Sequence, residues 1–200
     1  MVRYLHISPR LKNPWIVFAA TGWVLGLSAW ALGFVRPADA AKSTLWWFAL
    51  GGSLLALANT RSTRLTTWVW WLLVGVFALD NAVQGVIRGF FGVSPQPSLI
   101  AEALANTNTS ESFGFVMEQR GPILQGLLYA AVMLWVARLG HRAWAAPLGR
   151  GFQQTTSWWL IGGLAFTALL HLNPSMLRQQ PLMRWGVVFY RHAQAQEEIH

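Results

Sequence analysis

Five apolar runs constrain this chain more than any other feature of its sequence. They cover residues 14–35, 43–58, 65–90, 122–139 and 155–172. The hydrocarbon core of a bilayer is about 30 Å thick, and about 20 apolar residues cross it as a helix because each residue adds about 1.5 Å. The runs therefore predict an all-α membrane protein with five transmembrane helices.

The composition agrees with a membrane protein and excludes several other classes. Of the 200 residues, 54% are hydrophobic and 11% are charged, and 13 are Trp. The absence of Cys excludes disulfides, thiolate metal sites and a cysteine nucleophile. A net charge of +8 would suggest nucleic acid in a soluble protein. Here the basic residues lie mostly between or beside the apolar runs, where they set topology and contact lipid headgroups, so we expect no nucleic-acid partner.

The first run has the features of a retained membrane helix. An Ala-Asp-Ala sequence at 38–40 resembles a signal-peptide cleavage site, but the run exceeds the usual length of a signal, and Arg36 separates it from that site. Residues 36–42 are predicted to form a short loop. Within the run, Gly22 and Gly26 form a small-residue pair that admits a neighbouring helix.

Tryptophans cluster at the starts of the second and third runs. Trp46 and Trp47 open the second run, and Trp68, Trp70 and Trp71 open the third. Trp is enriched where a membrane meets water. We therefore predict that these five residues are interface anchors.

The acidic residues are concentrated in one stretch of the chain. Of the seven acids, four lie between residues 80 and 118, namely Asp80, Glu102, Glu111 and Glu118. Acids at or near a bilayer are costly and are therefore functional candidates. Residues 92–120 are also too many for a simple helix connection, and long loops are usually functional. We expect this loop to be partly helical.

Asp80 has two interpretations. It can form a structural ion pair with Arg88 or Arg120 at the membrane boundary, or it can bind a ligand. The ion pair, with Arg88 as its first candidate, is the preferred interpretation.

The chain after the fifth run is predicted to lie on the membrane surface. Asn173 and Pro174 end the fifth helix, and His171 is expected to cap its carbonyl groups rather than bind metal. Residues 173–200 are expected to form an interfacial helix and a linker after a membrane domain of residues 1–172. The residues at helical spacing are Leu182, Trp185, Val188, Phe189 and His192.

The distribution of Lys and Arg gives an orientation. With the N-terminus in the cytoplasm, eight of these residues lie inside and seven outside. The outside ones are spread over two long segments, and this weakens their influence. We therefore predict a cytoplasmic N-terminus, and the acidic stretch and the C-terminus on the opposite side.

Two polar segments resemble a known family. The first reads Asp80…Gly85…Arg88-Gly-Phe-Phe-Gly, then Glu102…Thr107-Asn108…Glu111. The second reads His171-Leu-Asn-Pro…Arg178…Pro181…Trp185…Tyr190-Arg191. Together they resemble the N-terminal membrane domain of bacterial phosphoethanolamine transferases, most of all the branch that modifies the lipopolysaccharide core. The lipid A and mobile colistin-resistance enzymes are more distant relatives.

The resemblance implies a site for phosphatidylethanolamine. In the family, the residues that match Thr107 and Glu111 lie on the periplasmic side and help to hold the lipid donor. A carboxylate at the interface pairs with the ammonium group of this lipid through charge-assisted hydrogen bonds. Glu102 and Asn108 are candidates for further acceptors around the headgroup. Asn108 and Glu111 also match a capping box, so a purely structural role stays open.

The sequence departs from the family at two places near this site. The lipid A branch has an Asn one turn before its Thr, where this chain has Ala103, so that contact is not carried over. Relatives often have Tyr-Gly where this chain has Phe91-Gly92.

The catalytic half of the family has no counterpart in this sequence. The family places a Thr nucleophile and a zinc site in a following periplasmic, sulfatase-like domain. The five His residues here, at 6, 141, 171, 192 and 200, include no pair at metal-ligand spacing on one helix face. No cofactor is expected in this chain, and zinc is expected in the missing domain.

The resemblance thus implies a membrane domain of the bacterial inner membrane that docks phosphatidylethanolamine among the membrane lipids. Transfer to a lipopolysaccharide-type acceptor would need a catalytic domain supplied in cis or in trans. The alternative is a non-enzymatic helical membrane subunit that anchors or positions a partner.

Overall fold

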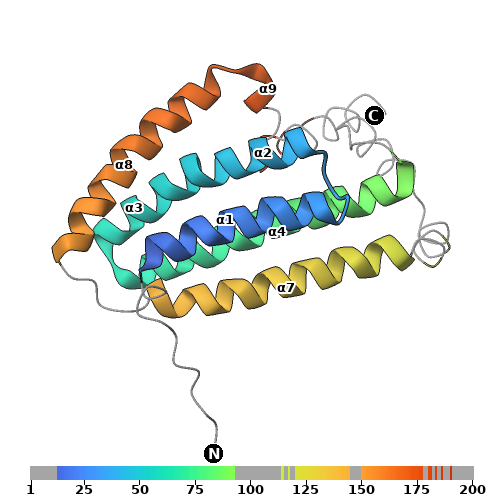
Figure 1. Cartoon of the computed structure of the whole chain (residues 1–200), viewed down its shortest axis with the longest axis horizontal. Helices are drawn as coiled ribbons and strands as arrows, with labels where there is room; N and C mark the ends of the chain where they lie inside the picture. Colours follow the sequence, from blue (N-terminus) through green and yellow to red (C-terminus); the bar gives the residue numbers. More distant parts are fainter. Residues whose placement is uncertain are drawn as a thin grey trace, which may run out of the picture.

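Long helices that run back and forth between two ends make up the described part of the chain (Figure 1). The computed structural model describes residues 13–92, 114, 117, 120–144, 150–177, 180, 181, 183, 186 and 190. No strand occurs among these residues. The elements are α1 (Pro14–Ala31), α2 (Pro37–Trp46), a π-helical turn (Trp47–Gly51), α3 (Gly52–Arg61), α4 (Thr63–Phe91), α7 (Arg120–Trp144), α8 (Arg150–His171) and α9 (Pro174–Leu177).

Three of the described helices, α1, α4 and α7, are long and apolar enough to cross a membrane. This confirms the prediction of an all-helical membrane protein. The elements α2, the π-helical turn and α3 follow one another without a break, so residues 37–61 form one helical rod. The helix α8 packs against this rod on the side away from α7 (Figure 1). All five apolar runs therefore lie mainly in helix.

The two ends of the bundle are distinguished by the residues that lie there. At the first, here called the Arg36 end, α1 and α4 end and α2 and α7 begin (Figure 1). The end of α8 lies beside the rod, where His171 contacts Trp46, the last residue of α2. At the opposite end, here called the Thr63 end, α1, α4 and α8 begin and α3 and α7 end.

The predicted loop at residues 36–42 is wrong, because α2 begins at Pro37. Pro at the first helical position has the required φ, and Asp39 in the first turn interacts favourably with the helix dipole. The actual turn comes earlier in the chain, where Gly33 has a φ of 72°. That backbone conformation favours glycine.

The prediction that Trp46, Trp47 and Trp70 are interface anchors is also wrong, because all three side chains are buried. Each indole N–H donates to a carbonyl oxygen of another element, at 2.8 Å to Met176, 3.0 Å to Phe18 and 2.9 Å to Ala137 respectively. An indole with a satisfied N–H is as acceptable in the interior as any large apolar ring.

Trp68 lies on the surface, as predicted, with 75% of its side chain exposed.

Small residues bring α1 and the rod into close contact. A Cβ atom added to Gly22 would overlap the ring of Trp47, and one added to Gly26 would overlap Oγ1 of Thr44. The structure therefore confirms that this pair admits a neighbouring helix.

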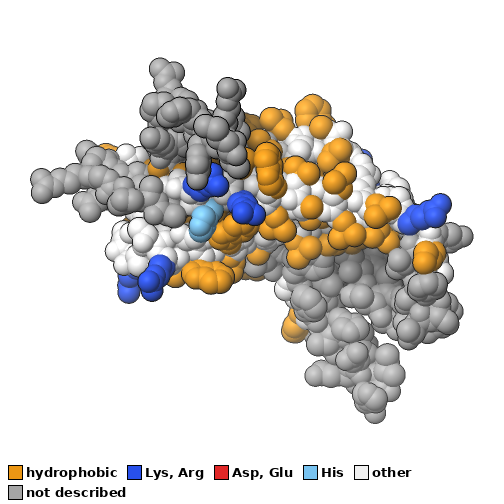
Figure 2. All heavy atoms as spheres, turned by 90° about the horizontal axis from the view of Figure 1, so that it is seen from below, with side chains coloured by type: hydrophobic (Ala, Val, Ile, Leu, Met, Phe, Trp, Pro, Cys, Tyr) orange, Lys and Arg blue, Asp and Glu red, His pale blue; other side chains and the backbone are white. Residues whose placement is uncertain are grey.

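The outward surface of the bundle is apolar. On α7, Leu124, Leu128 and Trp135 are each more than 60% exposed, while Tyr129 and Ala137 on the other face are buried. Figure 2 shows hydrophobic side chains spread between groups of Lys and Arg on either side. Such a surface suits contact with lipid chains, because monomers in water rarely expose large continuous apolar patches.

We predict that Gly22→Leu lowers the stability of the protein in detergent more than Gly75→Leu does. Gly22 abuts the ring of Trp47, whereas a Cβ at Gly75 has no atom within 4 Å. Overpacking of this kind costs about 1–3 kcal/mol. Thermal unfolding followed by size-exclusion chromatography measures the difference, and equal midpoints for the two variants would contradict the packing described here.

Candidate functional site

Buried polar side chains gather where α1, α4 and α7 meet. Asp80 and Asn81 are 1% exposed, Tyr129 is 4% exposed and Gln84 is 8% exposed. These four residues are here called the polar cluster. Polar and ionisable groups inside a membrane bundle are costly, so their presence marks a candidate functional site.

Hydrogen bonds in the polar cluster connect all three helices. The Tyr129 hydroxyl donates to the Leu25 carbonyl oxygen at 3.1 Å. The Asn81 Nδ2 donates to the Tyr129 hydroxyl at 3.1 Å and to the same carbonyl oxygen at 3.5 Å. One carbonyl of α1 thus accepts bonds from α4 and α7. Interhelical bonds of this type help to hold membrane helices together in the absence of water.

Within α4, the Gln84 Nε2 donates to Oδ2 of Asp80 at 2.7 Å. The two residues are four apart, so one turn of helix places them on the same face. Arg88 lies eight residues from Asp80, which is about 12 Å along the helix axis, and it is partly buried. The ion pair between Asp80 and Arg88 stays a prediction.

The acceptor oxygen of Asn81 is under-satisfied. Among the described residues, no donor bonds to Oδ1, although this atom is buried. A buried polar group without a partner costs about 1–3 kcal/mol. The Asn81 side chain in the polar cluster therefore lowers the stability of the protein through this oxygen.

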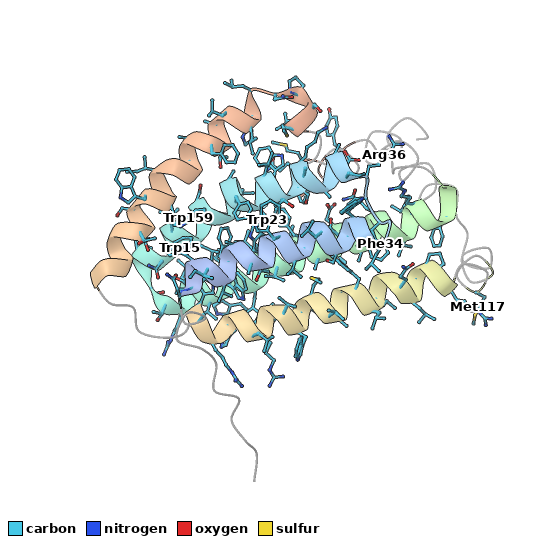
Figure 3. The ribbon with its side chains drawn as sticks, viewed as in Figure 1. Trp15, Trp23, Phe34, Arg36, Met117 and Trp159 are labelled. Carbon is cyan, nitrogen blue, oxygen red and sulfur yellow. The ribbon has the colours of Figure 1, made fainter. Side chains whose placement is uncertain are left out.

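Phe34 closes the polar cluster toward the Arg36 end. Its buried ring meets Tyr129 edge to face, with 5.3 Å between the ring centroids. A Cβ atom added to Gly85 would overlap the same ring. Figure 3 shows Phe34 near the end of α1, just before the chain turns into α2. The turn between α1 and α2 thus places an aromatic side chain between the polar cluster and that end of the bundle.

The predicted lipid-binding residues Glu102, Thr107, Asn108 and Glu111 lie outside the described residues. The structure does place the ends of the segment that carries them. The helix α4 ends at Gly92, whose φ of 66° is the left-handed cap conformation, and α7 begins at Arg120. Both points lie at the Arg36 end of the bundle (Figure 1).

The chain at the end of α8 is fixed to α2. The Lys42 ammonium donates to the Ser175 hydroxyl at 2.7 Å, and the Trp46 indole donates to the Met176 carbonyl at 2.8 Å. The His171 Nδ1 bonds to the Thr167 carbonyl oxygen at 2.8 Å, which confirms its predicted capping role. The residues directly after α8 therefore lie against α2, which begins at the Arg36 end.

The described residues form apolar grooves on the outside of the bundle, among them a larger and a smaller one. The larger, of about 400 Å³, lies beside α8, between Trp158 and Phe48. The smaller, of about 230 Å³, lies between α1 and α2. Among the labelled side chains of Figure 3, Trp159 lines the larger groove and Trp23 the smaller one.

Sequence reasoning did not find the grooves or the role of Tyr129. A Tyr in the middle of the fourth apolar run is a weak signal, because its hydroxyl needs a partner there. Asn81, beside Asp80 in the third run, is the residue that supplies that partner. No signal along the chain identifies the partner helix of either residue.

A comparison of the chain with known protein families, characterised proteins and solved structures finds no match. Among the described residues, no group of three or more His, Cys, Asp or Glu side chains is placed to hold a metal ion.

We predict that Asn81 and Tyr129 are energetically coupled. In a double-mutant cycle with Asn81→Leu and Tyr129→Phe, the coupling free energy should be about 0.6 kcal/mol and at most about 1.7 kcal/mol, the average and the maximum for hydrogen bonds between membrane helices. Unfolding by a denaturing detergent measures each variant. Gln125→Leu, on the exposed side of α7, is the control and should not couple to Asn81→Leu. Simple additivity of the Asn81 and Tyr129 variants would contradict the bond.

Proposed function

We propose that this chain is the membrane domain of a phosphoethanolamine transferase, and that it docks phosphatidylethanolamine for a catalytic domain outside this sequence. One observation supports this most directly. The end of α4 and the start of α7 lie at one end of the bundle, and α8 ends beside α2, which begins at that end. The acidic segment and the chain after α8 thus start from the same side, as a headgroup site beneath a following domain requires.

In this proposal all five helical rods cross the membrane. At about 1.5 Å per residue, the rod of residues 37–61 is about 37 Å long and α8 is about 33 Å long. Both exceed the hydrocarbon core of about 30 Å. With an odd number of crossings and a cytoplasmic N-terminus, the Arg36 end lies in the periplasm of a bacterial inner membrane.

The proposed headgroup site combines acidic and hydroxyl side chains. The Glu111 carboxylate pairs with the ammonium of the lipid, and Thr107 supplies a hydroxyl nearby. Glu102 and Asn108 add acceptors around the same group. Arg36 and Arg120, both exposed at this end of the bundle, are basic groups suited to the phosphate.

The proposed reaction is a double displacement that takes place outside this chain. The hydroxyl oxygen of a Thr in the catalytic domain attacks the phosphorus of the lipid, and diacylglycerol leaves with a proton. The acceptor hydroxyl on a lipopolysaccharide-type molecule then takes the phosphoethanolamine group and frees the Thr. This chain's own part is to hold the donor with its phosphate at the membrane surface, where that domain can reach it.

We predict that the Arg36 end faces the periplasm. Because the sequence has no Cys, single cysteines report topology directly. Cysteines at Ser98, Ser112 and Gln194 should react with a membrane-impermeant reagent in whole cells, whereas one at Thr63 should react only after lysis. Labelling of Thr63 but not of Ser98 in whole cells would reverse the orientation.

We further predict that the purified chain binds phosphatidylethanolamine in preference to phosphatidylglycerol, and that Glu111→Gln reduces this preference about tenfold. A charge-assisted hydrogen bond contributes about 1.5–3 kcal/mol, and about 1.4 kcal/mol corresponds to a factor of ten. Native mass spectrometry of the lipid-bound protein measures both affinities.

Glu118→Gln is the matched control for this prediction. It removes the same charge from a position that approaches Arg120 and is expected in solvent, where ion pairs contribute about 0–1 kcal/mol. Equal binding of the two lipids by the unaltered chain would instead favour a non-enzymatic membrane subunit that anchors a partner.

A further inference from the structure

The smaller apolar groove follows one half of α1. Its walls come from two neighbouring helices, which leave a channel of about 230 Å³ open to the surroundings of the bundle. The lining residues are Trp23, Gly26, Leu27 and Trp30 of α1, and Pro37, Ala40, Ala41 and Thr44 of α2. None of them is charged, so the groove suits a hydrocarbon chain.

The groove lies at the depth of a single lipid leaflet. The 18 residues of α1 span about 27 Å, close to the thickness of the hydrocarbon core. Trp23 is at the middle of this helix and Trp30 is seven residues further on, about 10 Å nearer to the Arg36 end. The groove therefore spans the depth of the leaflet on the side of Arg36 and does not extend into the other leaflet.

The shape of the groove comes from alternation of large and small side chains. Trp23 is 56% exposed and Leu27 is 52% exposed, so both project outward as walls. Gly26, Ala40 and Ala41 supply a low floor between them. Apolar contact alone gives little selectivity in a membrane, because the surrounding lipid tails are equally apolar. A preferred occupant must therefore also be held at its polar end.

Arg36 lies where that polar end would be. It directly precedes Pro37, which lines the groove, and its side chain is exposed. Figure 3 shows Arg36 at the start of α2, beyond the end of α1. A guanidinium group binds phosphate oxygens in a two-pronged geometry and is weakly hydrated, which suits the headgroup layer. Asp39, partly buried in the first turn of α2, adds one negative charge nearby. Binding of the phosphate at this position therefore relies on the paired N–H donors of the guanidinium group and not on a net positive charge.

The second cation of α2, Lys42, and the larger groove do not offer this combination. The Lys42 ammonium is engaged with the Ser175 hydroxyl. The larger groove, beside α8, is also lined by uncharged residues, and none of these is next to a Lys or Arg in the chain.

We propose that the groove between α1 and α2 binds one acyl chain of a phospholipid from the leaflet at the Arg36 end, with the phosphate of that lipid on the Arg36 guanidinium. The site is independent of the proposed transfer, because it needs neither the acidic segment nor a catalytic domain. It adds a defined lipid position beside the turn that carries Phe34.

Protection of a single cysteine tests this site. The natural chain has no Cys, so Ala41→Cys places one thiol in the groove, and Ala131→Cys places one on the exposed face of α7 as a control. The delipidated full chain in detergent is treated with a small apolar thiol reagent. Phosphatidylethanolamine or diacylglycerol, which lacks the phosphate, is then added over a range of concentrations.

Phosphatidylethanolamine should slow the labelling at position 41 at concentrations that leave position 131 unaffected, and diacylglycerol should protect about tenfold less well. Adding Arg36→Gln to Ala41→Cys should weaken the protection about tenfold, as loss of a charge-assisted bond predicts. Arg64→Gln, an equal loss of charge on an exposed residue at the Thr63 end, should leave the protection unchanged. Unaltered elution in size-exclusion chromatography shows that each variant is folded.

Three results would overturn the proposal. Equal protection at positions 41 and 131 would mean that lipid coats the bundle without a defined site. Equal protection by diacylglycerol would remove the role of the phosphate. Protection that survives Arg36→Gln would remove the role of Arg36. Because the cysteine assay does not involve Glu111, its failure leaves the proposed headgroup site untouched, and failure of the Glu111 prediction leaves the groove untouched.

Discussion

The close packing of α1 against the rod of residues 37–61 is the contact on which the rest of the bundle depends. The glycine pair of α1 lets the rod approach until the Trp47 ring stacks on Phe18, with 5.2 Å between centroids and 19° between planes. The same indole meets Phe77 and Trp70 of α4 edge to face. Helices in lipid gain little from leaving their solvent, so close contact and satisfied polar atoms must hold them together. Trp47 provides the close contact through its ring, and its polar atom is satisfied because the indole N–H donates to the Phe18 carbonyl oxygen.

The π-helical turn in the middle of this rod has a direct consequence for α8. Extra residues per turn change the direction of the side chains that follow, and such turns often occur at functional sites. Here the turn Trp47–Gly51 directs Trp47 toward α1, while Phe48 lines the larger groove beside α8. Immediately after it, Gly52 packs against the ring of Trp159, which itself stacks on Trp15. The packing of α8 against the rod and α1 thus involves mainly aromatic rings.

The aromatic ring cluster and the polar cluster lie at different places along the length of the bundle. The ring cluster of Trp15, Phe18, Trp144 and Trp159 fills the Thr63 end, whereas the polar cluster and the groove beside Trp30 lie toward the Arg36 end. The Thr63 end thus carries the aromatic ring cluster, and the polar cluster and the smaller groove lie nearer to the Arg36 end. Arg36, the proposed phosphate contact, lies at the Arg36 end, where α4 ends and α7 begins.

The sequence by itself determined the class of the protein, because that information is local. Hydrophobic runs predict helices, and a short-range signal, Asn173-Pro174, predicts the end of α8, which the structure has at His171. The small-residue pair of α1 was also readable as a helix contact. The acidic segment was recognised from composition and from its resemblance to a family, which the described residues do not test.

Tertiary structure alone decided which side chains face inward. The same residue type, Trp, is buried at position 70 and exposed at position 68, because helix rotation depends on the partner and not on hydrophobicity when the surrounding medium is itself apolar. The bond between Asn81 and Tyr129 joins residues 48 positions apart, and the groove at Arg36 exists only because two helices pack at that angle. Such pairings arise from the geometry of whole helices, and no local pattern in a single sequence specifies them.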